Sequence, residues 1–195
     1  GTENVSVGTN SLLNNQTGNS NTSLGYNSLC VNTASNNTTV GASSLCANTS
    51  GESNSAIGRN SLRSNTSGDE NTAIGRNALC ANTTSNGNVA VGVCALLKNT
   101  DGGNNVAVGR NSLFCNVTGG NNTAVGGLCL EMTTTSKNTA VGNQALEGQT
   151  TGECNVAVGF CAGHLMTTGI KSTAIGTEAL QSQTSACDNT AVGYQ

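Results

Sequence analysis

The sequence predicts an all-β fold, a parallel β-solenoid of the β-roll or β-helix type, from three observations. A pentapeptide of the form Asn-x-small-aliphatic-Gly recurs twelve times, once with Ser in place of Asn, and its glycine returns every 16 or 17 residues from Gly8 to Gly193. Leucine stands four residues after that glycine in ten of eleven units. Asn, Thr, Ser and Gly fill more than half of the 195 residues, proline is absent and aromatics make up 2%. A fixed short period is typical of repeat architectures, and a unit this rich in Asn, Gly and Thr is a poor helix former.

Each unit is numbered from its repeat glycine, which is position 0. Position −1 is always an aliphatic residue, from Val7 to Val192, and position +4 is the recurring leucine, as in Leu12 and Leu180. We expect short strands rich in Val and Thr to end at the glycine, which accepts positive φ at a corner. Coils about 4.8 Å apart then give about eleven stacked coils of 16–17 residues and a rod roughly 55 Å long. The aliphatics at −1 and +4 are predicted to fill the interior; handedness stays open, with a left-handed winding favoured.

Asparagine occupies position −4 in eleven of twelve units, and Ser172 is the exception. Buried amides that bond equivalent amides above and below would explain this recurrence, as in stacked β-structures. A preference of Asn for turns is the simpler alternative. We favour the amide ladder, because a turn preference alone would also admit Asp and Gly.

Residues 1–195 form one uninterrupted array. The first residues align with Gly68-Asp69-Glu70-Asn71, so the chain starts inside a unit, and it also stops inside one. Solenoids need covered ends. We therefore expect either an excerpt of a longer repetitive chain or ends covered by further subunits.

Nine cysteines in a chain almost without aromatics indicate an oxidising compartment, with disulfides in place of some core. Cys30 and Cys46 share a position in adjacent coils and are the best candidate pair. Cys80/Cys94 and Cys115/Cys129 are each 14 residues apart, three positions out of step, so they need a corner between them or a second chain. Cys154 is a candidate partner of Cys161, and Cys187 is left over. Unpaired thiols in small interior spaces remain the alternative for all of them.

Ten Asn-x-Ser/Thr sequons are present. Five of them share position +7, on the polar turn, where we expect the asparagine to point outward and carry a glycan if the source is eukaryotic. These glycosylation candidates are Asn15, Asn48, Asn65, Asn82 and Asn116.

Several functions find little support. A net charge of −3 and a pI near 4.9 argue against nucleic acid as a partner, and no apolar run approaches the roughly 20 residues of a membrane span. No metal site or cofactor is predicted: Cys-x-x-Cys is absent. The acids are scattered among different positions, so we expect no enzyme. Cys161-Ala-Gly-His164 resembles a thiol–imidazole pair, but it falls where the repeat degenerates.

The units Asn71-Thr-Ala-Ile-Gly75, Asn122-Thr-Ala-Val-Gly126 and Asn138-Thr-Ala-Val-Gly142 resemble the head repeats of trimeric autotransporter adhesins and of related phage and viral fibre proteins. The resemblance implies a left-handed parallel β-roll, assembled as a trimer, that binds host surfaces. The unit here is longer, and the cysteines depart from the pattern. Val108-Gly109-Arg110-Asn111-Ser112-Leu113 also resembles a hexapeptide of left-handed β-helix acyltransferases. Those enzymes use coils of about 18 residues, protruding loops and a catalytic His, and this uninterrupted array has no such loop.

These observations favour an extracellular or cell- or virion-surface structural protein, a stiff rod that is stapled by disulfides, glycosylated and part of a fibril or surface fibre. Its expected partner is itself, as an end-to-end polymer or a homotrimer, with glycans or a host surface as further partners. The first alternative is a trimeric adhesin or fibre head. The second is ice binding, because a Thr column can present a flat hydroxyl lattice; four Val residues interrupt that column at position −3.

Overall fold

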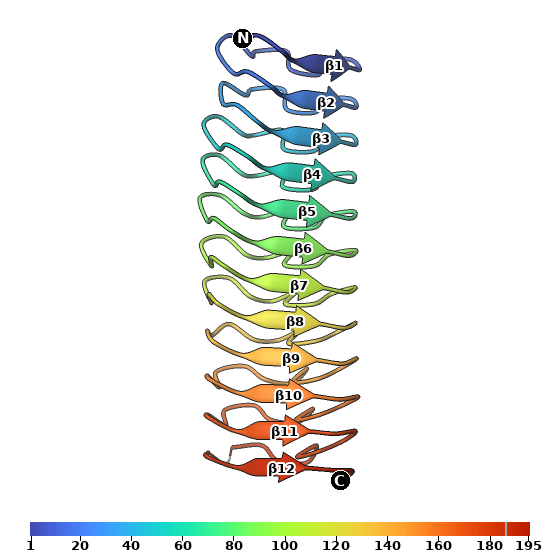
Figure 1. Ribbon diagram of the computed structural model, residues 1–195, viewed down its shortest axis with the longest axis vertical. Coiled ribbons are helices and arrows are strands. Elements are labelled where there is room, and N and C mark those ends of the chain that lie inside the picture. The colour runs from blue at the N-terminus through green and yellow to red at the C-terminus, as the bar shows by residue number, and fades with distance from the viewer. Residues whose placement is uncertain (186) are drawn as a thin grey trace.

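The computed structural model describes residues 1–185 and 187–195, which form a column of stacked coils without a helix in that part of the chain (Figure 1). Each coil contributes one three-residue strand, and all twelve belong to a single parallel sheet in chain order. The strands are β1 (Val5–Val7), β2 (Thr22–Leu24), β3 (Thr38–Val40), β4 (Ser55–Ile57), β5 (Thr72–Ile74), β6 (Val89–Val91), β7 (Val106–Val108), β8 (Thr123–Val125), β9 (Thr139–Val141), β10 (Val156–Val158), β11 (Thr173–Ile175) and β12 (Thr190–Val192). The predicted β-solenoid is confirmed.

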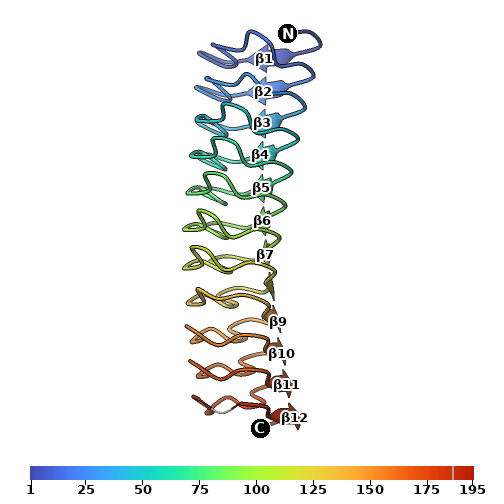
Figure 2. The same cartoon turned by 90° about the vertical axis from the view of Figure 1, so that its left-hand side faces the viewer.

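Equivalent residues of consecutive coils are direct neighbours in the sheet. Val91 pairs with Val108, one unit later. In the two 16-residue units the pairing is equally regular, as in Thr22 with Thr38, so the missing residue lies outside the strand. Loss of a residue within a strand would turn the following side chains to the other face. Figure 2 shows the strands following one another along one side of the rod, with the turns on the other side.

The glycine at position 0 is required by the close approach of successive coils. Gly58 has a φ of 134°, and a Cβ added there would lie 2.5 Å from the carbonyl oxygen of Gly75. Both the backbone conformation and the contact exclude a side chain. This explains why the sequence returns to glycine at the end of each strand.

The turn after the glycine is built from left-handed residues. Position +2 has positive φ, as in Asn60 at 59°, and so does the leucine at +4, as in Leu62 at 48°. Asn adopts this conformation readily, but Leu rarely does. The leucine is held there because its side chain is completely buried, with 0% exposure for Leu62.

The interior is lined by two main apolar columns. The leucines at +4 form one, as predicted, and the alanines at −2 form the other, with Ala73 and Leu79 both fully buried. The prediction that the aliphatic at −1 faces inward is wrong: none of these twelve residues is buried, and Ile74 is 39% exposed. Side chains alternate across a strand, so placing the small Ala opposite Leu inside the narrow coil turns Val and Ile outward.

The asparagines at −4 form the predicted ladder, but it runs from amide to backbone. Asn54 Oδ1 accepts a hydrogen bond from the Asn71 backbone N–H at 3.0 Å, and Asn54 Nδ2 donates to the Gly68 carbonyl at 2.8 Å. At the one exception, Ser172 uses its hydroxyl oxygen to accept from the Asn189 N–H at 3.4 Å. The buried side chains therefore satisfy backbone groups at the corner before each strand.

Candidate functional site

The outer face of the sheet, which we define as positions −3 and −1 of β1–β12, is a surface of regular chemistry. Position −3 holds Thr, Val or Ser, and position −1 holds Val, Ile or Leu. Neither position carries a charged residue in any coil, and none of these side chains is buried. Isolated exposed aliphatics are common on proteins, but a contiguous apolar strip is typical of an interaction surface.

Charged side chains flank this face on both sides. The residue after the glycine, at +1, is an exposed arginine in three coils: Arg59, Arg76 and Arg110. We call this side the basic edge. The corner before the strand, at −6 and −5, carries mostly acids among its charged residues, and we call it the acidic edge. Its charged residues are Glu3, Glu52, Asp69, Glu70, Glu153 and Asp188, with Lys137 and Lys171 as the two cations.

The asparagines at +7 do not point outward as predicted. Asn48, Asn65, Asn82 and Asn116 have 0% exposure, and Asn15 is half-buried. They form a second ladder, from amide to amide: Asn65 Nδ2 donates to Asn48 Oδ1 at 2.9 Å and to the Gly68 carbonyl at 3.0 Å. The same pattern extends from Asn15 to Asn116. Thr133 takes the next place, so the ladder stops there and the buried Asn116 Oδ1 has no hydrogen-bond partner among the described residues.

This geometry excludes a glycan on the buried ladder in the folded rod. N-glycosylation replaces one hydrogen of Nδ2 by a sugar, and both hydrogens of Asn65 Nδ2 already serve buried hydrogen bonds. The structure therefore contradicts the outward glycan stripe at Asn48, Asn65, Asn82 and Asn116. The fifth candidate, Asn15, is half-buried and its Nδ2 donates one hydrogen bond, to the Gly18 carbonyl. Among the sequon asparagines, only Asn36 and Asn121 are exposed.

All nine cysteines are free thiols. The structure does bring the first candidate pair together: the Sγ atoms of Cys30 and Cys46 lie 3.8 Å apart in neighbouring coils. Burial, followed by the nearby Cys30, raises the pKa of the Cys46 thiol. Cys80 and Cys94 both lie in the turn after the strand, and proximity to Cys94 contributes to the raised pKa of Cys80, behind the larger effect of burial. The turn supplies the corner that this pair needs, and both residues are free thiols.

The other two candidate pairs are not brought together. Cys129 is fully buried and its S–H donates to the Ala140 carbonyl at 3.2 Å, whereas the sulfur of Cys115 accepts from Lys98 Nζ at 3.7 Å. Cys154 and Cys161 lie at opposite ends of β10. The spacing of the two cysteines in the sequence could not predict this separation, because the separation depends on which side chains point into the coil.

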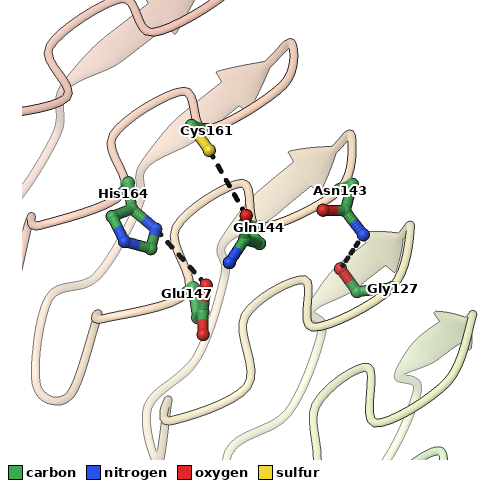
Figure 3. Close-up of polar contacts among 6 residues, drawn as sticks. All are labelled: Gly127, Asn143, Gln144, Glu147, Cys161 and His164. Carbon is green, nitrogen blue, oxygen red and sulfur yellow. Dashed lines mark hydrogen bonds and ion pairs between the residues drawn. The ribbon is translucent and has the colours of Figure 1, made fainter.

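A small polar cluster connects the coils around β9 and β10 (Figure 3). His164 Nδ1 lies 3.3 Å from Glu147 Oε2, while the Cys161 S–H is directed to Gln144 Oε1 at 3.5 Å. The thiol and the imidazole thus have separate partners. Burial, followed by the negative charges of Glu178 and Glu147, raises the pKa of Cys161, which keeps it a thiol near neutral pH. An activated nucleophile needs the opposite shift.

Residues 1–185 and 187–195 contain neither a cluster of metal-ligating side chains nor a membrane-spanning helix. No three His, Cys, Asp or Glu side chains there are grouped closely enough to hold a metal ion. The same residues contain no helix of the length and apolarity that crossing a bilayer requires.

No protein family, curated protein or solved structure matches this chain. The likeness to adhesin heads therefore remains a resemblance carried by one pentapeptide per unit. The functional argument therefore depends on two features of the structure itself: the outer face with its two charged edges, and the buried asparagine ladder at +7. Sequence reasoning missed the outer face because Val and Ala are both apolar, so composition alone does not show which of them turns inward.

Proposed function

We propose that the chain is a structural rod that contributes a stiff segment to a fibre outside the cell. The observation that carries the proposal is the regularity of the stack: each strand pairs in register with the next from β1 to β12, and no loop is inserted between coils in the described part of the chain. A rod made of near-identical coils, joined by continuous hydrogen bonding, resists bending. The cysteine content of a chain almost without aromatics supports a location outside the reducing cytosol, where the neighbouring thiols of Cys30 and Cys46 would oxidise to a disulfide.

The test is where the chain lies in its native assembly. Electron microscopy of native material, labelled with an antibody to this chain, is expected to show label along the length of a filament. Label confined to the tip of a stalk would contradict the proposal and favour a fibre head of the adhesin type. Small-angle X-ray scattering of the isolated chain should give a rod about 55 Å long per chain, from the 4.8 Å spacing of parallel coils.

Ice binding is a second candidate, favoured by one observation. Position −3 carries Thr in seven of the twelve strands, and it shares one outer face with the aliphatic column at −1, which repeats from β1 to β12 at the strand spacing. The Thr hydroxyls of that face make no hydrogen bond within the described part of the chain, so they are available to ordered water. Thermal hysteresis in a freezing assay would support this candidate, and its absence at high protein concentration would end it.

A further inference from the structure

We propose that the outer face of the sheet is the contact surface for a second copy of this chain, lying parallel to the first and in the same register. This deepens the proposed function and rests on it in one respect, since it names the lateral partner of the rod. The proposal depends on the size, the apolar centre and the charged edges of the outer face.

The size of the face suits a stable dimer. Eleven strand spacings of about 4.8 Å give a length of roughly 53 Å, and the seven positions from −5 to +1 span roughly 20 Å. Their product is about 1,000 Å², whereas each partner in a stable interface contributes roughly 800 Å². The centre of the face is uncharged over its whole length, with Ile57, Ile74 and Ile175 each near 40% exposed. Burial of such side chains against a partner is favourable.

The charged edges select the partner. The arginines of the basic edge, including Arg59 and Arg76, make no ion pair: the single ion pair among the described residues joins His164 and Glu147. The acids of the acidic edge likewise form no ion pair within that part of the chain. In coil 4, Glu52 and Arg59 stand on opposite sides of β4, and in coil 5, Glu70 and Arg76 stand on opposite sides of β5.

A two-fold axis parallel to the rod brings these edges together. Two identical faces related by that axis place the acidic edge of one copy opposite the basic edge of the other, coil for coil. Glu70 of each copy then faces Arg76 of the other copy, and Glu52 faces Arg59, so each of these contacts is made twice, as an isologous interface requires. The pairs are confined to coils 4 and 5, because Arg110 faces the uncharged Gly103 and Asn104 in this register. Sheets pack about 10 Å apart, a gap that Arg and Glu side chains span from either side.

The opposite orientation is less favourable. In an antiparallel pair the two basic edges meet each other, and Arg59 and Arg76 lose their acidic partners. An uncharged partner such as an ice surface makes no use of either edge. The Thr hydroxyls of the face hold bridging water in a dimer of this kind, as wet interfaces commonly do. The reciprocal edges therefore favour a parallel second copy.

The decisive experiment uses two charge-reversed variants of the full chain. One carries Arg59→Glu and Arg76→Glu, and the other carries Glu52→Arg and Glu70→Arg. Sedimentation equilibrium is expected to show a dimer for the parent chain and monomers for each variant alone, with at least about 100-fold weaker association, because like charges then face each other. An equimolar mixture should restore a 1:1 dimer. Failure of the mixture to dimerise, or a dimer formed by either variant alone, would overturn the parallel geometry.

A second pair of variants tests the apolar centre. Val125 on the outer face and Val117 in the turn region are similarly exposed, at 36% and 39%. Val125→Lys should weaken the dimer at least about tenfold, whereas Val117→Lys should leave it unchanged. Circular dichroism is expected to show that both variants retain the parent fold. A parent chain that stays monomeric, or that forms a discrete trimer, overturns the proposed dimer. Antibody label along a filament in native material would still support the structural rod, so failure of the dimer can be distinguished from failure of the proposed function.

Discussion

Asn65 donates a hydrogen bond from its Nδ2 atom to the Oδ1 atom of Asn48, 2.9 Å away in the preceding coil. Asn82 makes the same bond to Asn65 at 2.8 Å, so each amide both donates and accepts along the rod. These amides are completely buried. Buried hydrogen-bonded networks stabilise when every member is satisfied and are costly when one member is lost. The ladder is therefore a structural element rather than a surface feature.

We predict that Asn65→Asp destabilises the rod. The substitution removes the donor that bonds Asn48 and Gly68 and buries a carboxyl group, at a cost of about 3 kcal/mol at neutral pH. Urea unfolding followed by circular dichroism should show a lower midpoint, with partial recovery at acidic pH, where the carboxyl is protonated. Asn104→Asp is the matched control, since Asn104 is exposed and Asp tolerates its φ of 57°. Equal midpoints for the two variants would contradict the ladder.

We predict that Gly58→Ala disrupts the stack locally. The new Cβ would lie 2.5 Å from the Gly75 carbonyl oxygen, at a φ of 134° that alanine rarely adopts, so a loss of at least about 3 kcal/mol is expected. Hydrogen exchange should show faster opening in the coils around β4 and β5. Gly103→Ala serves as the control, because its Cβ would lie 3.3 Å from the nearest atom and its φ is not positive. Normal protection of β4 and β5 in the Gly58 variant would refute the close-approach argument.

We predict that Cys129 makes stability fall at alkaline pH. Burial raises the pKa of its thiol from 9.0 to about 12 in the folded chain. The folded state therefore keeps the proton where the unfolded state loses it, so this contribution is complete below pH 9 and declines as pH rises toward 12. Cys129→Ala, which places at +3 the residue found there in Ala78 and Ala95, should flatten the unfolding midpoint over that range. An unchanged pH profile would show that another group is responsible.

Cysteine accessibility offers a separate check. Alkylation by iodoacetamide near pH 8, followed by mass spectrometry, should modify the exposed Cys154 and Cys187 quickly and leave Cys129 unmodified in the folded rod. The thiolate is the reactive form, and it is scarce at a buried site with a raised pKa. Rapid modification of Cys129 in folded protein would mean that its coil opens readily.

We predict that mild oxidation joins Cys30 to Cys46. Their Sγ atoms are already 3.8 Å apart, so a disulfide needs only a small local adjustment. Closing the 15 residues between them should stabilise the chain by about 3 kcal/mol. Treatment with oxidised glutathione should raise the denaturation midpoint of the parent chain and have no such effect on Cys46→Ser. Two free thiols at these positions after oxidation would contradict the expected bond.

The sequence predicted which residues stack in columns along the rod, but not which of these columns face the interior. The 17-residue return of the pentapeptide was enough to place Val91 beside Val108, which the sheet register confirms. The period also predicted correctly that Leu79 is buried, because Leu79 is the only large aliphatic residue in the turn of its coil. It failed for Ile74 and Asn65, whose positions inside or outside the coil are the reverse of those predicted. A three-residue strand gives too short an alternation for the inward phase to be read from composition.

By itself, the sequence determined the period, the parallel stacking and the need for glycine at each strand end. The tertiary structure alone decided that alanine faces the leucine column, that asparagine rather than valine completes the interior, and that the aliphatics form an outer face between two charged edges. The physical reason is the narrow cross-section of one coil. Leu79 and its equivalents occupy most of the interior, so only small side chains and amides that satisfy buried backbone groups fit beside them.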